Sequence, residues 1–349
     1  MRSPTLHDVA RTAGVSYSTA DRVLNGRGGV AEKSVLRVQH AIHELGYIRD
    51  IHAANLSRRR SYRFHFFLPR GEHGFFSVLR ETLLGEAAGR ATDRFLVTCR
   101  DVPAFDAERL AAELNRLEPG ECDCAAVVGA DSPALTAAIA RLAALRIPVV
   151  TLVSDTASDA RSLYVGIDNR VAGRTAGRLM RMAHRGRTGR VLLVLGTMGV
   201  RDHRERLEGA REVMGAPEAG LDLLPPIEVQ DQPDTMRERL GEALRSDGAI
   251  SGVYSIGAGN RALIDLVGTL PGPRPFAILH ELTPYSRAAL EKGLIDAVID
   301  QKPAEEIARA LDAMRALADG QAPPATEIVP TIYLKDNLPG AGRAAEKAS

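Results

Sequence analysis

Four side chains on the outer face of a short predicted helix have the chemistry to read nucleic acid. Tyr17, Ser18, Asp21 and Arg22 fall at outward positions of this helix, toward its N-terminal half. An arginine can donate two parallel hydrogen bonds to guanine, and serine or tyrosine can contact bases or phosphates. A solvated polar face is the alternative interpretation, because short helices commonly present one. The elements around these residues decide between the two.

Those elements are predicted to be a helix-turn-helix. Thr5 can cap a first helix with Asp8 in the capping-box position, and Gly14 ends that helix. Ser16 can then cap the second helix. Two short helices joined by a glycine-containing turn form this motif. A third helix follows with apolar residues at spacings of three and four, completing a three-helix core. Its inward positions are Val35, Val38, Ile42 and Leu45.

The charge distribution agrees with a polyanion partner for this first unit only. The whole chain has a net charge of +1, but residues 1–63 hold eleven Lys and Arg against five Asp and Glu. The remaining residues hold 34 basic against 39 acidic side chains. A basic N-terminal unit on an acidic body favours nucleic acid as the partner of the N-terminal unit.

Cysteine content and hydropathy exclude several classes. Cys99, Cys122 and Cys124 are an odd number and do not form a disulfide framework. No nearby histidine pair completes a tetrahedral metal site, so we expect free thiols and no metal. No run of eighteen apolar residues occurs, and no apolar stretch follows the basic N-terminus. We therefore expect the chain to stay in the cytoplasm.

From Arg63 onward, short apolar runs alternate with helical stretches, which is typical of parallel sheets covered on both faces. The strands fall into two sets, so the sequence predicts an α/β domain of two doubly wound lobes. The first set is 64–68, 95–98, 125–128 and 149–152, and the second is 191–195, 252–256 and 276–279.

The first sixty residues resemble the headpiece of the lac repressor family. The resemblance rests on TLHDVARTAGVSYST at 5–19, RVLN at 22–25, AIHELGY at 41–47 and AANL at 53–56. It implies a hinge that folds when two protomers sit on DNA, with Leu56 as an apolar wedge in the minor groove. The expected DNA contacts are Thr5, Ser16, Tyr17, Ser18, Thr19, Arg22, Asn25, Ala53, Asn55 and Leu56.

The chain departs from the family pattern at three sites. Asp21 places a carboxylate on the helix that faces DNA, Arg49-Asp50 replaces a Pro-Asn pair, and Ala31 replaces a capping serine. Asp21 could accept from cytosine, pair with Arg22 or weaken phosphate contact. These departures affect the operator sequence that we expect, not the DNA-binding role.

The remainder resembles the periplasmic-binding-protein-like fold, in which the chain crosses between lobes three times. We expect the crossings near 155–169, 295–302 and 327–334, and an effector cleft between the lobes. The predicted organisation is a headpiece at 1–48, a hinge at 49–61, an effector domain at 62–337 and a disordered tail at 338–349. The first lobe is predicted at about 62–163 and 294–323, and the second at about 164–293 and 324–337.

The same resemblance supplies candidate effector ligands. Phe75 and Phe76 could stack on a sugar ring, with ordinary core packing as the alternative. Arg206 could donate to a pair of hydroxyls. We interpret Asp168 and Asn169 as helix-capping residues rather than ligands. The full predicted set is Phe75, Phe76, Asp155, Arg206, Asn260, Glu281 and Gln301.

One enzyme alternative comes from Gly257-Ala258-Gly259, which follows a strand and opens a helix like a dinucleotide fingerprint. That fingerprint belongs to the first strand and helix of its domain, whereas this copy lies late in the second lobe. We therefore expect a repressor without enzymatic activity or cofactor, and not a nicotinamide enzyme. Its expected partners are an operator and a sugar-like effector, or a non-sugar metabolite, and it is expected to form a homodimer or tetramer.

Overall fold

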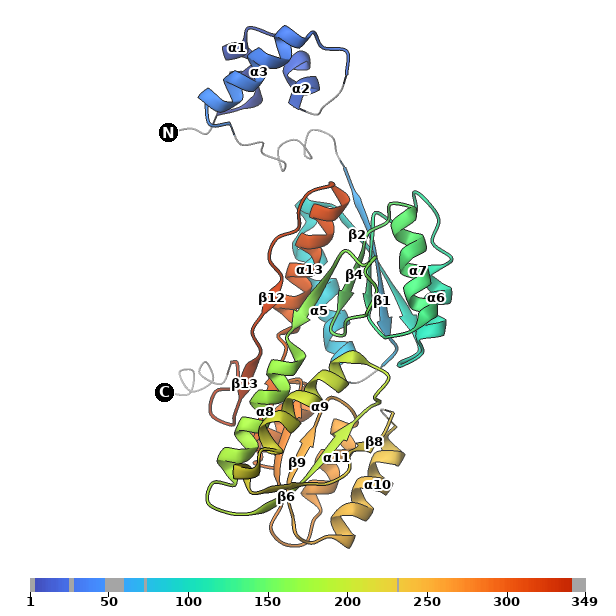
Figure 1. Ribbon diagram of the computed structural model, residues 1–349, viewed down its shortest axis with the longest axis vertical. Helices are drawn as coiled ribbons and strands as arrows, with labels where there is room; N and C mark the ends of the chain where they lie inside the picture. The colour runs from blue at the N-terminus through green and yellow to red at the C-terminus, as the bar shows by residue number, and fades with distance from the viewer. Residues whose placement is uncertain (1–3, 25–27, 48–59, 72–73, 231, 341–349) are drawn as a thin grey trace. The chain divides into compact units, whose positions relative to one another are not determined.

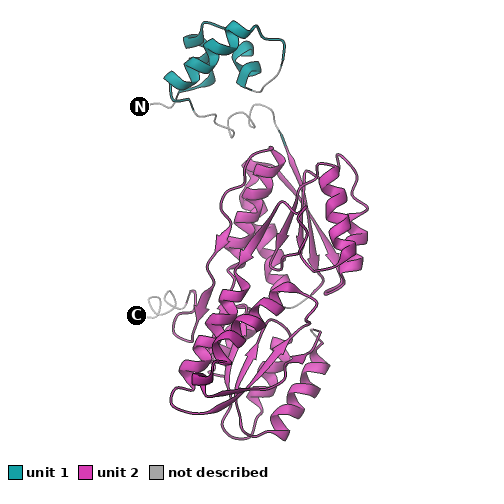
Figure 2. Cartoon of the chain, viewed as in Figure 1, with its two compact units in different colours: residues 1–60 teal, residues 61–349 magenta. Residues whose placement is uncertain are grey.

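A computed structural model of the chain describes residues 4–24, 28–47, 60–71, 74–230 and 232–340. It divides into two compact units, residues 1–60 and residues 61–349 (Figure 2). Within the described ranges, no helix combines the length and the apolar character needed to cross a membrane.

The first unit contains the predicted helix-turn-helix. Thr5 and Asp8 form the capping box, with Thr5 N donating to Asp8 Oδ2 at 2.9 Å. Gly14 ends the first helix in a left-handed conformation with φ 62°, and Ser16 Oγ accepts from Thr19 N at 3.1 Å. The third helix begins after Ala31 without a side-chain cap. The helices are α1 (Leu6–Ala13), α2 (Tyr17–Leu24) and α3 (Glu32–Glu44), packed around Val9, Ala10, Ala13, Ala20, Val38 and Ala41.

The second unit contains two sheets, and each has helices on both faces (Figure 1). The first sheet is entirely parallel, in the order β12-β5-β4-β3-β1-β2. Helices α5 and α13 cover one face, and α6 and α7 cover the other. Its strands are β1 (Tyr62–Pro69), β2 (Phe95–Val102), β3 (Cys124–Val128), β4 (Val149–Leu152), β5 (Leu163–Ile167) and β12 (Glu327–Ile328). Its helices are α5 (Phe75–Gly89), the 3-10 turn η1 (Ala91–Asp93), α6 (Ala107–Leu114), α7 (Pro133–Ala144) and α13 (Pro303–Ala318).

The second sheet has the order β13-β11-β10-β9-β6-β7, with β8 also paired to β6. Only β13 is antiparallel among the described strands. Helices α8 and α9 cover one face, and α10, α11 and α12 cover the other. The strands are β6 (Gly189–Leu195), β7 (Leu221–Leu223), β8 (Ile227–Glu228), β9 (Ile250–Ser255), β10 (Phe276–His280), β11 (Ala297–Asp300) and β13 (Thr331–Tyr333). The helices are α8 (Asn169–Ala183), α9 (Arg201–Met214), η2 (Pro217–Ala219), α10 (Pro233–Ser246), α11 (Asn260–Gly268) and α12 (Pro284–Glu291).

The strand pairing corrects the predicted lobe boundaries. β5 and β12 belong to the first sheet, and β11 belongs to the second, so the boundaries at 164, 294 and 324 were wrong. The crossings follow β5, β11 and β12, inside the ranges expected for them. Leu338 is buried in the second-lobe core, so the predicted tail began too early. The predicted hinge at 49–61 lies almost entirely outside the described residues.

Two glycines let α8 and α9 pack backbone against backbone. A Cβ on Gly173 would overlap the carbonyl oxygen of Arg206, and one on Gly209 would overlap that of Arg170. Interiors are packed densely enough that an added methyl group has no space to occupy. This close approach fixes the position of the α9 residues that face the cavity described next.

Candidate functional site

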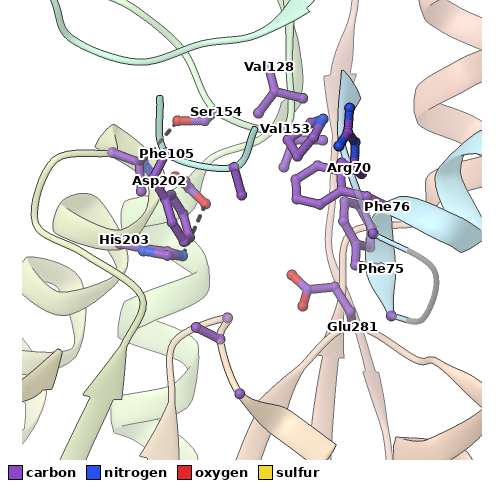
Figure 3. Close-up of a pocket in the computed structure, with 18 of the residues that line it drawn as sticks. Arg70, Phe75, Phe76, Phe105, Val128, Val153, Ser154, Asp202, His203 and Glu281 are labelled. Atoms are coloured by element: carbon purple, nitrogen blue, oxygen red, sulfur yellow. Dashed lines mark hydrogen bonds and ion pairs between the residues drawn. The ribbon is translucent and has the colours of Figure 1, made fainter. Parts of the chain in front are cut away.

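A cavity of about 420 Å³ lies between the two lobes of the second unit (Figure 3). Loops that follow the carboxyl ends of parallel strands line it from both sides, which is where ligands bind in open α/β sheets. Its volume falls within the range of small-molecule sites, which is roughly 300–1,000 Å³.

The first-lobe wall of the cavity is largely apolar. The rings of Phe75 and Phe76, at the start of α5, meet edge to face with centroids 5.3 Å apart. Phe105, from the loop after β2, has a left-handed backbone with φ 60° and is 39% exposed. Its ring packs beside that of His203 from the second lobe, with the ring centroids 5.9 Å apart. Figure 3 shows Phe75 and Phe76 with Arg70 and Val153 on one side of the cavity, and Phe105 on the opposite side beside Asp202 and His203.

The second-lobe wall carries buried charge. Arg206, on α9, is 1% exposed and donates through Nε to Asn169 Oδ1 at 2.8 Å and through Nη1 to the Ile256 carbonyl at 2.9 Å. Glu281 Oε1 lies 3.4 Å from Arg206 Nη1. Among the described residues, Arg206 Nη2 and Asp202 Oδ1 have no hydrogen-bond partner. A donor and an acceptor are thus held together with bonding capacity that the protein does not use.

The electrostatics of this wall follow from burial. Burial alone would lower the pKa of Arg206, because it disfavours the cation. The nearby Asp202 and Glu281 have the larger combined effect and raise this pKa. Burial raises the pKa of Glu281 to about 8, against the opposing attraction of Arg206. Glu281 therefore holds a proton at neutral pH and can donate as well as accept. Its φ of 65° is left-handed, a strain of the kind found at functional sites.

A buried polar network connects Arg206 to the lobe crossings. Asn169 Nδ2 donates to the Val153 carbonyl at 3.4 Å and to Tyr164 Oη at 3.3 Å. Val153 N donates in turn to Glu306 Oε1 at 3.0 Å. Asp168, not Asn169, caps α8, accepting from Val171 N at 2.9 Å. The interpretation of Asn169 as a capping residue was wrong, because its amide supports Arg206 from within the core.

Most predicted effector residues come together at the cavity. Phe75, Phe76, Arg206, Asn260 and Glu281 line it. The two phenylalanines also pack against the core, so both interpretations of them hold. Asn260 Oδ1 accepts from Ser255 Oγ at 2.7 Å, and its Nδ2 donates to the His280 carbonyl at 2.9 Å. The Asn260 amide therefore stabilises the loop between β9 and α11.

Two predicted ligands lie elsewhere. Gln301 is behind the wall, where its Nε2 donates to Glu281 Oε1 at 3.2 Å. Asp155 is not among the residues that line the cavity, so its assignment as a ligand was wrong. It accepts from Arg161 Nε at 2.6 Å and from Thr151 Oγ1 at 2.6 Å, and it borders a separate shallow recess. The position of Asp155 after a strand suggested a ligand, but the sequence did not show that Arg161, six residues later, would hold its carboxylate.

Sequence reasoning missed several lining residues. Asp202 precedes Arg206 by one helical turn, a spacing that places both on one face of α9 and could have identified it. Phe105, Arg70 and Tyr285 also line the cavity. The sequence around these three residues carries no local pattern that points to a ligand. Gly257 and Gly259 suggested a dinucleotide-binding loop. They belong to the second lobe and line this same cavity.

On the first unit, the predicted DNA-contact residues of α2 are presented to solvent. Tyr17, Ser18 and Arg22 are exposed, and the Tyr17 ring lies 4.4 Å from that of His7. Thr5 and Ser16 are engaged in helix caps, and Thr19 is half-buried. Predicted contacts outside the described residues are Asn25, Ala53, Asn55 and Leu56.

Comparison with known families matches both units. Residues 64–322 match the periplasmic binding protein domain, and residues 5–50 match the family described as bacterial regulatory proteins, lacI family. The HTH-type transcriptional regulator DegA of Bacillus subtilis is 24% identical over 63% of this chain and 62% of its own length. The maltose regulon regulatory protein MalI of Escherichia coli is 48% identical over 52 residues, 15% of each chain. The chain thus matches less than two thirds of the length of these relatives.

Solved structures of solute-binding proteins share the fold of the second unit. One from Agrobacterium vitis, bound with α-D-tagatopyranose, aligns with a TM-score of 0.72 at 19% identity, covering 82% of this chain and 98% of that one. Another from Burkholderia graminis, in complex with D-arabinose, has a TM-score of 0.71 at 20% identity, covering 80% and 98%. The chain therefore belongs to the periplasmic binding protein domain family, and it carries at its N-terminus a helix-turn-helix of the lacI family of bacterial regulatory proteins.

Proposed function

We propose that this protein is a DNA-binding transcriptional repressor whose operator affinity is set by a sugar-like effector bound between its two lobes. The observation that carries the proposal is the joining, in one chain, of a lacI-family helix-turn-helix to a two-lobed ligand cavity. Relatives over 52 to 78 residues include proteins named as the sucrose operon repressor and the maltose regulon regulatory protein. Control of carbohydrate genes is the corresponding role for this chain.

The DNA side of the proposal rests on α2. Its exposed Tyr17, Ser18 and Arg22 form the recognition surface, and the basic first 63 residues supply phosphate attraction. One short helix reads too few bases for useful specificity, so a homodimer binds a near-palindromic operator in the cytoplasm. The hinge with Leu56 as a wedge completes the minor-groove contact.

The effector side rests on the polar wall of the cavity. Asp202, Arg206 and Glu281 offer planar polar groups that suit adjacent hydroxyls. A ligand held between lobes favours one lobe arrangement over another, and that difference changes operator affinity through linkage.

DNA binding is tested by footprinting on the region upstream of the protein's own gene. Arg22→Ala is expected to weaken protection about 5- to 150-fold, the loss of one base-reading arginine. Arg37→Ala, on the exposed face of α3, is the matched control for lost charge. Leu56→Ala should weaken operator binding if the wedge is correct. Equal footprints for Arg22→Ala and Arg37→Ala would contradict the role of α2.

Effector control is tested by repeating the footprint with a panel of monosaccharides after thermal-shift screening. Asp202→Asn and Gln301→Ala should each blunt the sugar response while leaving sugar-free operator binding intact. Arg206→Ala should abolish the response. A response to amino acids or nucleotides, but to no sugar, would contradict the effector class while leaving the regulator in place.

A further inference from the structure

Two helices begin at the cavity without a side-chain cap. The first four backbone N–H groups of an α-helix have no partner within the helix. At α5 and α11 no side chain caps these groups, and neither first turn contains an acidic residue. Phe75 and Phe76 of α5 line the cavity, as do Asn260, Arg261 and Ala262 of α11. Both helix ends therefore present N–H donors and a positive partial charge to a ligand.

The other described helices that begin at the cavity differ from these two. Asp106 caps α6, and Thr283 caps α12. The helices α9 and α10 have no side-chain cap, but each has an aspartate in its first turn, Asp202 and Asp234. The positive helix ends that the protein leaves uncompensated are thus α5 in the first lobe and α11 in the second.

Arg206 independently indicates a ligand that accepts hydrogen bonds. It lines the cavity and is 1% exposed, and its Nη2 has no hydrogen-bond partner among the described residues. The Asp202 carboxylate is 4.0 Å away from this nitrogen, beyond hydrogen-bond distance. A buried charged N–H group without a partner costs free energy, so an oxygen supplied by a ligand stabilises it.

Two more arginines line the cavity at exposed positions. Figure 3 shows Arg70, which follows β1, beside Phe76 and on the same side of the cavity as Glu281. No residue that the structure describes pairs with the Arg70 guanidinium. Arg261 lies over the Tyr285 ring, with Cζ 4.5 Å from the ring centroid, and this stacking leaves the N–H edge of the guanidinium available.

The acidic residues of the cavity do not cancel this positive charge. Burial raises the pKa of Glu281 to about 8, so at neutral pH its carboxyl group donates to an anion instead of repelling it. Asp106 is exposed to water and accepts from Arg109 N at 2.9 Å in capping α6. The described lining residues therefore set three arginines against the carboxylates of Asp106 and Asp202.

We propose that the effector is an acidic sugar: a hydroxylated ring whose carboxylate or phosphate is attracted by the uncapped ends of α5 and α11 and by the guanidinium groups of Arg70 and Arg261. This inference rests on the proposed effector function and specifies its ligand as an anionic sugar rather than a neutral one. Arg70 and Arg261 then determine the specificity for charge.

The test is isothermal titration calorimetry of the full-length protein with sugars matched at carbon 6. Glucose, galactose and mannose are each compared with the corresponding uronate and 6-phosphate. An acidic form of the preferred sugar is expected to bind at least about tenfold more tightly than the neutral form, and higher ionic strength should reduce this preference. Preference for the uronate identifies a carboxylate as the charged group, and preference for the 6-phosphate identifies a phosphate.

The double variant Arg70→Gln/Arg261→Gln should reduce the ratio of acidic to neutral affinity at least about fivefold. Both side chains are exposed, so we expect the variant to fold, and the single variants show which arginine contributes more. Arg178→Gln is the matched control, because Arg178 is an exposed arginine of α8 outside the cavity and its replacement should leave the ratio unchanged.

Three results would count against the inference. Neutral sugars that bind as tightly as their acidic forms would overturn it and leave the sugar-regulated function standing. An unchanged ratio in the double variant would overturn the role of these arginines in selecting charge. Failure of every neutral and acidic sugar to bind would overturn both the inference and the proposed effector class.

Discussion

Replacing Asn169 by alanine tests whether the buried network holds Arg206 for its ligand. The amide oxygen of Asn169 accepts from Arg206 Nε at 2.8 Å, and both residues are buried. Removing it leaves a charged N–H without a partner in a site that water does not reach. We expect the protein to lose stability and Arg206 to lose its fixed orientation at the cavity.

The magnitude follows from the type of bond. A hydrogen bond to a charged group contributes about 1.5–3 kcal/mol. The bonds from Asn169 Nδ2, at 3.3 and 3.4 Å, are longer and add less. We therefore expect Asn169→Ala to destabilise the second unit by about 2–3 kcal/mol. Effector affinity should fall roughly tenfold or more, since each 1.4 kcal/mol corresponds to one factor of ten.

The assay pairs thermal unfolding with calorimetric binding of the tightest sugar or glycoside from screening. Asp168→Ala is the control, because Asp168 is the neighbouring residue and caps α8 without contacting Arg206. Loss of the cap should cost about 1 kcal/mol and leave effector affinity unchanged. An Asn169→Ala variant that binds effector as the wild type does, or that is no less stable than Asp168→Ala, would refute this role of Asn169.

Three further predictions follow from packing, titration and lobe contact. Gly173→Ala should lower stability by about 1–3 kcal/mol in thermal unfolding, because its Cβ would overlap backbone. Gly85→Ala, at an open helical position, should be neutral or stabilising. Burial raises the pKa of Glu306 to about 8, so its folded form keeps a proton that the unfolded form releases. Stability from this group is therefore present at low pH and lost as pH rises from about 4.5 through 8. Between pH 6 and 8, wild type should lose about 2 kcal/mol relative to Glu306→Gln in urea titrations, and parallel pH profiles would contradict this. Arg204 pairs with Asp131 across the lobes, and both side chains are partly exposed. An exposed ion pair contributes about 0.2–1 kcal/mol, so Arg204→Ala should weaken effector binding by no more than about fivefold in calorimetry. A far larger loss would indicate that Arg204 contacts the ligand directly.

The sequence by itself determined features whose interactions are local. The capping box of Thr5 and Asp8, the left-handed Gly14 and the cap at Ser16 each involve residues no more than four apart, so their pattern is legible in one dimension. The alternation of apolar runs with helices likewise predicted two parallel-sheet lobes. Arg206 and Glu281 were predicted from the family resemblance, Arg206 because it precedes Gly209 by three residues and Glu281 because it follows a predicted strand.

Only the tertiary structure decided which of several equivalent polar residues face the cavity. Asp155 and Asp202 look alike in sequence, but Arg161 engages the first, whereas the second lines the cavity with Arg206 on one face of α9. Asn169 and Arg206 are 37 residues apart, and Arg206 and Glu281 are 75 apart. Which sheet β5, β11 and β12 join is also fixed by pairing with distant strands. Burial and long-range pairing depend on the whole fold, so no local pattern could supply them.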